Sequence, residues 1–403
     1  MGMPFVMLSS VAVVMFSKMG ISDARATFWA SLIVLPWSLK PLWSPFLEMF
    51  RTKKYFVVMT EFITGISFAL VALSLPLPNF FTYAIALMGI IAFSGATHDI
   101  ATDGIYMAEL DASTQARYIG WQGAFFNIAK VAAKGGLVFL AGTLKNDVGI
   151  AHAWMIVMGI CAGTMLLFSF WHGVSLPSGG AAAATIRSAR EGWRSFVEVV
   201  TSFFTKKHIL LYVLFIILYR LAEGLVDKVL QLFLMAPVEK GGLGLEEQML
   251  GLINGTFGTV AFIVGSILAG YFISVRGLRR TLFVLCCSMN LPFLVYLLLS
   301  VIQPTGIWLI GSAVVAEYFG YGFGFVGLTL FMMQQVAPGS HKMAHYAFAS
   351  GIMNLGYMLA GMASGLISDL LGYRWFFIVV ALAMIPAMIM SRVVPFVHND
   401  NQK

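Results

Sequence analysis

The sequence contains little charge. Asp, Glu, Lys and Arg make up 11% of the 403 residues, whereas hydrophobic residues make up 59%. An ordinary soluble domain has about 25% charged residues, so this class is excluded. The apolar runs reach about 20 residues, the length that an α-helix needs to cross roughly 30 Å of hydrocarbon. The composition therefore predicts an all-α integral membrane protein.

Cysteines are few, and catalytic motifs are missing. Each of Cys161, Cys286 and Cys287 falls in an apolar run, which indicates packing rather than a disulfide or a metal site. No H-E-x-x-H, G-x-S-x-G or Cys/His cluster occurs. We therefore expect no metal, no cofactor and no enzyme. The glycines of "GYGFGFVG" (320–327) lie in an apolar run with no preceding strand, so we predict that they pack helices.

About twelve membrane-spanning helices are predicted. They cover 1–17, 25–47, 55–76, 80–108, 118–143, 152–174, 208–236, 247–274, 281–302, 306–336, 343–370 and 375–395. The longest polar gap begins with Pro, Gly and Ala and continues as a basic amphipathic helix. We predict an N-terminal six-helix bundle (1–175), a cytoplasmic amphipathic linker (176–207), and a C-terminal six-helix bundle with a short tail (208–403).

Most Lys and Arg residues outside the predicted spans fall in the connections on one side of the membrane. Because cytoplasmic loops accumulate these residues, both termini are predicted to be cytoplasmic. The net charge of +7 therefore orients the chain in the membrane, and it does not indicate nucleic-acid binding.

A basic turn recurs at the same place in each half. "EMFRTKKYF" (48–56) and "GYFISVRGLRRTLF" (270–283) both join the second and third spans of a half, which indicates an internal duplication. The second turn resembles the loop signature of the major facilitator superfamily, with Ser274 where an acidic residue is usual. The resemblance implies two pseudo-symmetric six-helix bundles.

Five ionisable residues are predicted near the middle of the membrane: Lys130, Lys134, Arg220, Glu223 and Glu317. Such residues usually face the bundle interior or a water-filled cavity. We predict that Lys130 and Arg220 hold substrate carboxylates, and that Glu223 or Glu317 carries a coupling proton. Each could instead form an ion pair that fixes helix register.

Asp99 and Asp103 share a helix face near the predicted cytoplasmic end of span four. They could form an inner gate or cap the helix, and Asp99 could pair with Lys130. Asp227 continues the charged stripe of Arg220 and Glu223.

Two further features concern substrate contact and mobility. Trp121, Gln122 and Asn127 could contact a sugar or could pack helices. Three prolines near Lys40, at 36, 41 and 45, predict a broken second span.

Three segments carry a closer resemblance: "LPWSLKPLWSPFLE" (35–48), "SGATHDIATDGIYMAEL" (94–110) and "YRLAEGLVDK" (219–228). They resemble the AmpG-like branch of the superfamily, which holds bacterial muropeptide permeases. The resemblance implies a proton-linked inner-membrane importer of anhydro-muropeptides. The matching positions are Trp43, Asp99, Asp103, Arg220, Glu223 and Asp227.

We therefore predict a secondary active transporter of the bacterial inner membrane that imports an anionic sugar-peptide and is driven by the proton gradient. Its site is expected at the interface of the two halves, with alternating access. The expected partners are a small molecule and lipid, with no nucleic acid, and the expected state is a monomer. The alternatives are an exporter of amphiphilic compounds, a carrier of another organic anion, and a sensor or scaffold that does not transport.

Overall fold

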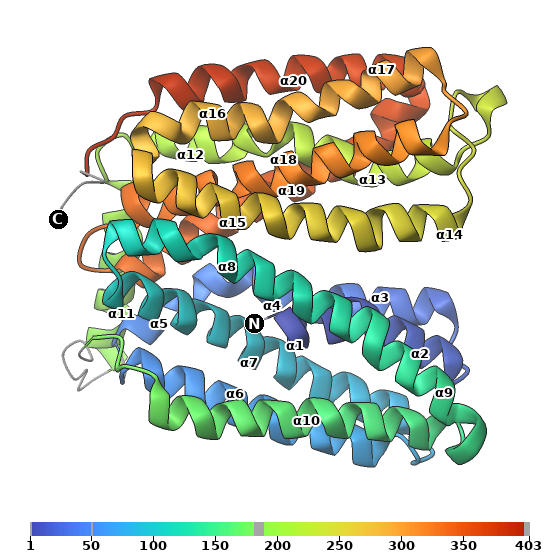
Figure 1. Cartoon of the computed structure of the whole chain (residues 1–403). Helices are drawn as coiled ribbons and strands as arrows, with labels where there is room; N and C mark the ends of the chain where they lie inside the picture. Colours follow the sequence, from blue (N-terminus) through green and yellow to red (C-terminus); the bar gives the residue numbers. More distant parts are fainter. Residues whose placement is uncertain (1, 50, 181–188, 399–403) are drawn as a thin grey trace. The chain divides into compact units, whose positions relative to one another are not determined.

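The fold is a computed structural model that describes residues 2–49, 51–180 and 189–398, and the described chain is helical without a strand (Figure 1). The first half contains α1 (Gly2–Val6), α2 (Ala12–Lys18), α3 (Asp23–Ile33), α4 (Leu35–Leu39), α5 (Ser44–Met49), α6 (Lys53–Ser74), α7 (Phe80–Glu109), α8 (Ala112–Val131), α9 (Val138–Val148) and α10 (Ile150–Ser175). The second half contains α11 (Ala189–Phe204), α12 (Ile209–Tyr219), α13 (Leu221–Met235), α14 (Glu247–Leu250), α15 (Thr259–Arg276), α16 (Leu278–Asn290), α17 (Leu294–Ile302), α18 (Ile307–Phe331), α19 (Lys342–Leu371) and α20 (Tyr373–Val393).

Within the described chain, ten helical runs are long and apolar enough to cross a membrane. Two shorter apolar runs, Gly2–Lys18 and Phe28–Leu42, accompany them. Together they correspond to the twelve predicted spans, and the prediction of an all-α membrane protein is confirmed.

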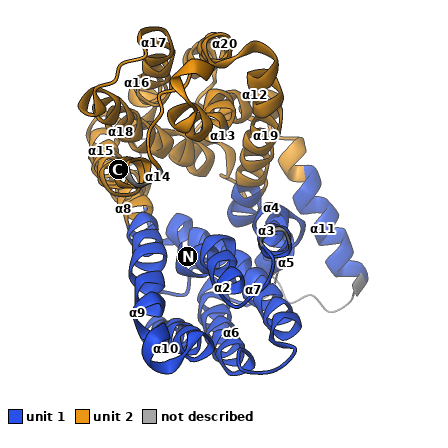
Figure 2. Ribbon diagram, turned by 90° about the vertical axis from the view of Figure 1, so that its right-hand side faces the viewer, with its two compact units in different colours: residues 1–110, 125–201, 341–347 blue, residues 111–124, 202–340, 348–403 orange. Residues whose placement is uncertain are grey.

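The chain divides into two compact units (Figure 2). Unit 1 contains 1–110, 125–201 and 341–347, and unit 2 contains 111–124, 202–340 and 348–403. Two short segments, 111–124 and 341–347, therefore group differently from the halves that the linker predicts. Close packing explains both: Ser266 Oγ donates to the Gly120 carbonyl in unit 2 (3.2 Å), and Glu48 Oε1 accepts from the Met343 amide in unit 1 (2.7 Å).

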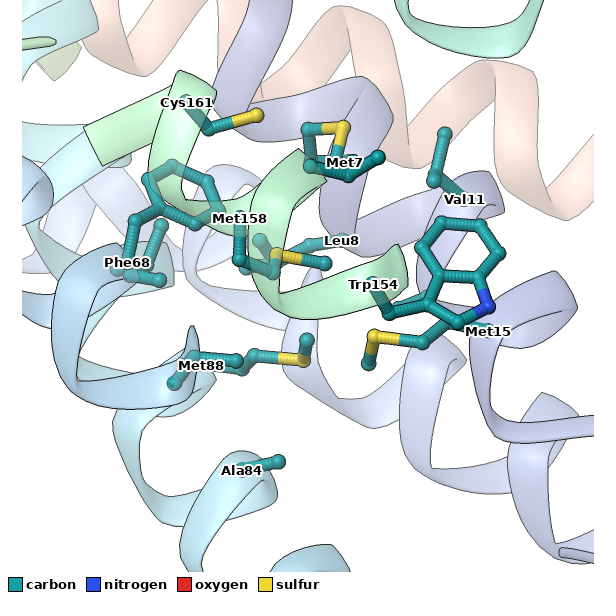
Figure 3. Close-up of a cluster of buried hydrophobic side chains, with 14 of the residues drawn as sticks. Met7, Leu8, Val11, Met15, Phe68, Ala84, Met88, Trp154, Met158 and Cys161 are labelled. Carbon is teal, nitrogen blue, oxygen red and sulfur yellow. The ribbon is translucent and has the colours of Figure 1, made fainter. Parts of the chain in front are cut away.

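The core of unit 1 is rich in methionine (Figure 3). Met7, Met158 and Phe68 are fully buried in it, together with Cys161. Methionine fills irregular gaps between helices because its side chain is long and unbranched. The burial of Cys161 agrees with the packing role expected for it.

The glycines of α18 bring helices of unit 2 together. A Cβ at Gly320 or Gly324 would overlap backbone carbonyl oxygens of α16, and one at Gly322 would overlap the Phe262 carbonyl of α15. Small residues allow such close approach of helices. The segment 320–327 is therefore a packing element, as its lack of a preceding strand predicts.

Two interruptions of the helices carry buried charges. The second span breaks at a 3-10 turn, Lys40–Leu42, as the prolines predict. The seventh span breaks at Arg220, whose φ of −104° and ψ of 5° separate α12 from α13. Both Lys40 and Arg220 are buried, so each interruption places a cation inside a unit.

Candidate functional site

Arg220 forms a closed ion pair in unit 2. Its Nε donates to Glu223 Oε2 (2.6 Å) and its Nη2 donates to Glu223 Oε1 (2.5 Å). The guanidinium also lies over the rings of Tyr357, at 4.4 Å, and Phe325, at 5.2 Å. A planar fork that binds both carboxylate oxygens is the geometry that arginine favours. Arg220 and Glu223, which the three-residue spacing places on one stripe, therefore form an ion pair within one turn of the chain.

Glu317 on α18 has a different environment in the same unit. It is 6% exposed, and Tyr296 Oη donates to its Oε2 over 3.1 Å. The described residues give Glu317 no ion pair with Lys, Arg or His. Glu223 and Asp227 are the charged neighbours of Glu317. Among the described residues, Glu317 therefore has a neutral hydroxyl as its partner, whereas Glu223 has a cation.

Asp227 is the exposed member of the stripe. It lies one helical turn beyond Glu223 on α13, and the hydroxyl of Tyr357 hydrogen-bonds to it. Gly224 permits the close approach of α13 to α19, because a Cβ there would lie 2.7 Å from the Tyr357 carbonyl. Unit 2 therefore brings together the acids and the arginine that the sequence places at 220–227 and 317.

Asp99 has a partner that the sequence analysis did not assign to it. Lys40 Nζ lies 3.2 Å from Asp99 Oδ2, and the side chains are only 7% and 21% exposed. No ion pair joins Asp99 to Lys130 in the part of the chain that the structure describes, so the predicted pair is wrong. Asp99 is instead paired with Lys40, which lies in the 3-10 turn of the second span.

Asp103 and Trp43 lie beside this pair in unit 1. Asp103 is 6% exposed and is a charged neighbour of the Lys40 ammonium. Trp43 Nε1 donates to Thr97 Oγ1 over 3.1 Å, which ties the broken second span to α7. Asp99 and Asp103 therefore form part of a buried charge cluster rather than only a solvated helix end.

The four predicted contact residues of α8 are divided between the units. Trp121 and Gln122 belong to unit 2, whereas Asn127 and Lys130 belong to unit 1. Trp121 is 38% exposed, and the other three are partly buried. Their roles in binding stay predictions.

A second buried cluster joins three helices of unit 1. Glu61 on α6 contacts His98 of α7 and His172 of α10. This cluster could not be predicted from the sequence, because His172 is separated from Glu61 by 111 residues. Among the described residues, no group of three or more His, Cys, Asp or Glu is placed to hold a metal ion.

Comparison with known proteins gives the family. The Major Facilitator Superfamily matches residues 1–344. This chain belongs to that superfamily. Its members are transporters, so the chain is a transporter and not an enzyme, as predicted.

The relatives agree with the AmpG-like resemblance. The anhydromuropeptide permease of Escherichia coli (strain K12) is 22% identical over 373 residues, which cover 91% of this chain and 72% of the permease. A Rickettsia conorii protein that carries the name transporter AmpG 4 is 20% identical over 396 residues, which cover 96% of this chain and 92% of that protein.

Solved structures agree with the fold. The transporter FucP in the outward conformation has a TM-score of 0.71 at 14% sequence identity, and the match covers 100% of this chain and 97% of FucP. At this identity the likeness shows the fold alone.

Proposed function

We propose that this transporter uses the proton gradient to import an anionic sugar-peptide of the anhydro-muropeptide class across the bacterial inner membrane. The similarity to an anhydromuropeptide permease over 91% of the chain carries the substrate class. The termini are cytoplasmic in this proposal, and the chain works as a monomer without a bound cofactor.

Glu317 carries the coupling proton in this proposal. It is buried, it accepts a hydrogen bond from the neutral hydroxyl of Tyr296, and its charged neighbours are acids. Intramembrane carboxyl groups commonly mark proton relays in transporters. A change of access to water then allows the proton to leave.

Arg220 holds a carboxylate of the substrate. Glu223 occupies the Nε–Nη2 edge of the guanidinium in the structure, so the substrate binds by competing with Glu223 for Arg220. Lys130 supplies the second cation, while Trp121, Gln122 and Asn127 contact the sugar. Asp227, Asp99 and Asp103 act in gating.

The test is uptake of a labelled anhydro-muropeptide by the purified protein in lipid vesicles. Uptake should follow an imposed pH gradient, and Glu317→Gln should abolish this dependence because an amide cannot carry the proton. Glu239→Gln is the matched control, since Glu239 is exposed in the loop after α13. Uptake that ignores the gradient in the unchanged protein would overturn the proton coupling.

The substrate class is tested with two cation variants. Lys130→Ala and Arg220→Ala should each lower uptake about tenfold, which corresponds to about 1.4 kcal/mol of lost binding. Lys134→Ala is the control, because Lys134 lies one turn further along the same run and is exposed. Absence of uptake together with efflux of amphiphilic dyes would make the chain an exporter instead.

A further inference from the structure

Glu61 shares its carboxylate between two imidazole rings inside unit 1. His98 Nε2 lies 3.0 Å from Glu61 Oε1, and His172 Nδ1 lies 2.8 Å from Oε1 and 3.0 Å from Oε2. The side chains are 4% exposed for Glu61, 12% for His98 and 29% for His172. The three groups come from α6, α7 and α10, which are all apolar helices long enough to span a membrane.

The acceptors around the two histidines indicate which ring nitrogens carry hydrogen. An ionised carboxylate can only accept, so both ring nitrogens that face Glu61 carry hydrogen. On the far side of His98, Thr102 Oγ1 lies 3.5 Å from Nδ1 while its own hydroxyl donates to the His98 carbonyl over 2.8 Å. The Thr102 oxygen therefore turns a lone pair toward Nδ1. His98 has an acceptor at each nitrogen, which is the arrangement that suits an imidazolium ion.

A bound proton would also balance the charge of the cluster. With both histidines neutral, the cluster would hold one uncompensated negative charge among apolar helices, which is costly. One added proton makes the cluster neutral. Asp99, the next residue of α7, also acts on His98, and Lys40 compensates Asp99.

We propose that Glu61, His98 and His172 form a proton-binding site that is separate from Glu317. The proton enters at the partly exposed ring of His172, which lies one turn from the end of α10 at Ser175. It is then shared through Glu61 with His98, and it leaves by the same ring.

The proton site is linked to the Lys40–Asp99 pair through a single turn of α7. His98 faces Glu61, while the adjacent Asp99 faces Lys40. Loss of the proton strengthens the negative potential at this turn and so changes the interaction between Asp99 and Lys40. This coupling role rests on the proton-driven transport proposed above, whereas proton binding does not.

The first experiment measures proton binding without substrate. The full chain, labelled with ¹⁵N at histidine, is reconstituted in lipid bilayers, and the imidazole shifts are followed from about pH 5 to about pH 8. Spectra of His98→Gln and His172→Gln assign the two rings. Exposed His152, also on α10, serves as the internal reference, and His152→Gln is the matched control.

The cluster should hold one imidazolium within this pH range, because a carboxylate neighbour favours the charged ring, and its titration should differ from that of His152. Glu61→Gln should remove this difference. Neutral rings at His98 and His172 over the whole range, or an unchanged midpoint in Glu61→Gln, would overturn the proposal. The spectrum of the unchanged protein is decisive even where a variant fails to fold.

The second experiment measures the coupling. At equal pH on both sides of the vesicle, His172→Gln should shift the pH midpoint of substrate exchange, whereas His152→Gln should not. An identical midpoint in His172→Gln would limit the site to proton binding and overturn its link to transport. Failure of the unchanged protein to respond to a pH gradient would overturn the proposed function and leave the imidazole titration as evidence for the site.

Discussion

The ammonium of Lys40 lies 3.2 Å from a carboxylate oxygen of Asp99, and neither side chain is more than about a fifth exposed. The cation sits in a 3-10 turn that interrupts the second span, and the acid sits in the continuous helix α7. An interruption lined by prolines thus brings a buried charge to its partner within unit 1.

This ion pair predicts a non-additive effect of substitution. Lys40→Met or Asp99→Asn alone should lower the free energy of unfolding by up to about 3–5 kcal/mol, because each leaves an uncompensated buried charge. The double variant should lose less than the sum of the two, since neither charge remains. Thermal unfolding of the four purified proteins, followed by tryptophan fluorescence, measures the cycle. Additive losses would show that the two residues act independently.

Arg220 should not be replaceable by lysine. The guanidinium binds Glu223 through two nitrogens and lies flat over Tyr357 at 4.4 Å. A lysine ammonium keeps the charge but loses the fork and the stacking. Arg220→Lys should therefore lower substrate uptake about tenfold or more, which is the effect of losing about 1.5 kcal/mol or more from a charge-assisted hydrogen bond. Full uptake in this variant would mean that charge alone is sufficient.

The fold could be predicted from the sequence because an apolar run of span length has one stable form in a bilayer, the helix. The break of the second span near Lys40 could also be predicted, because proline lacks the backbone N–H that a helix needs. The break at Arg220 could not be predicted, because no proline or glycine precedes it in "LYR".

The sequence predicts how deep each charged residue lies along its helix, but not its partner. A rise of about 1.5 Å per residue places a residue along the helix axis but does not show which neighbour it faces. Asp99 was therefore matched with Lys130 by depth, although Lys40 is its partner. Arg220 and Glu223 share one turn, so their spacing predicted that they lie on the same stripe. His172 and Glu61 lie on different helices, so their contact could not be predicted from spacing.

Lys206, in the connection between α11 and α12, should react as an unusually weak base. Its Nζ donates to the carbonyls of Val336 and Pro338, and burial lowers its pKa to about 8 from 10.5. Competitive amine labelling over a pH series, read by mass spectrometry, should give Lys206 a midpoint near this value, with exposed Lys207 as the internal control. Equal midpoints would contradict the burial of the ammonium.

The same shift predicts the sign of a stability change. Between about pH 8 and pH 10.5 the unfolded chain holds a proton on Lys206 that the folded chain has released. Stability therefore rises with pH across this window and is reduced below it, where the folded state must bury the charge. In Lys206→Met this rise should be smaller, which unfolding measured at both ends of the window would detect.

Gly120 should be intolerant of even one methyl group. A Cβ at this position of α8 would overlap the carbonyl of Ser266 on α15, whereas a Cβ at Gly123 would meet Phe262 at 3.6 Å, an ordinary contact. Alanine favours a helix over glycine by about 1 kcal/mol, so Gly123→Ala should be neutral or stabilising. Gly120→Ala should instead destabilise by about 1–3 kcal/mol, because overpacking forces the helices apart. Thermal unfolding of the matched pair tests this, and equal melting temperatures would mean that α8 and α15 can separate without loss.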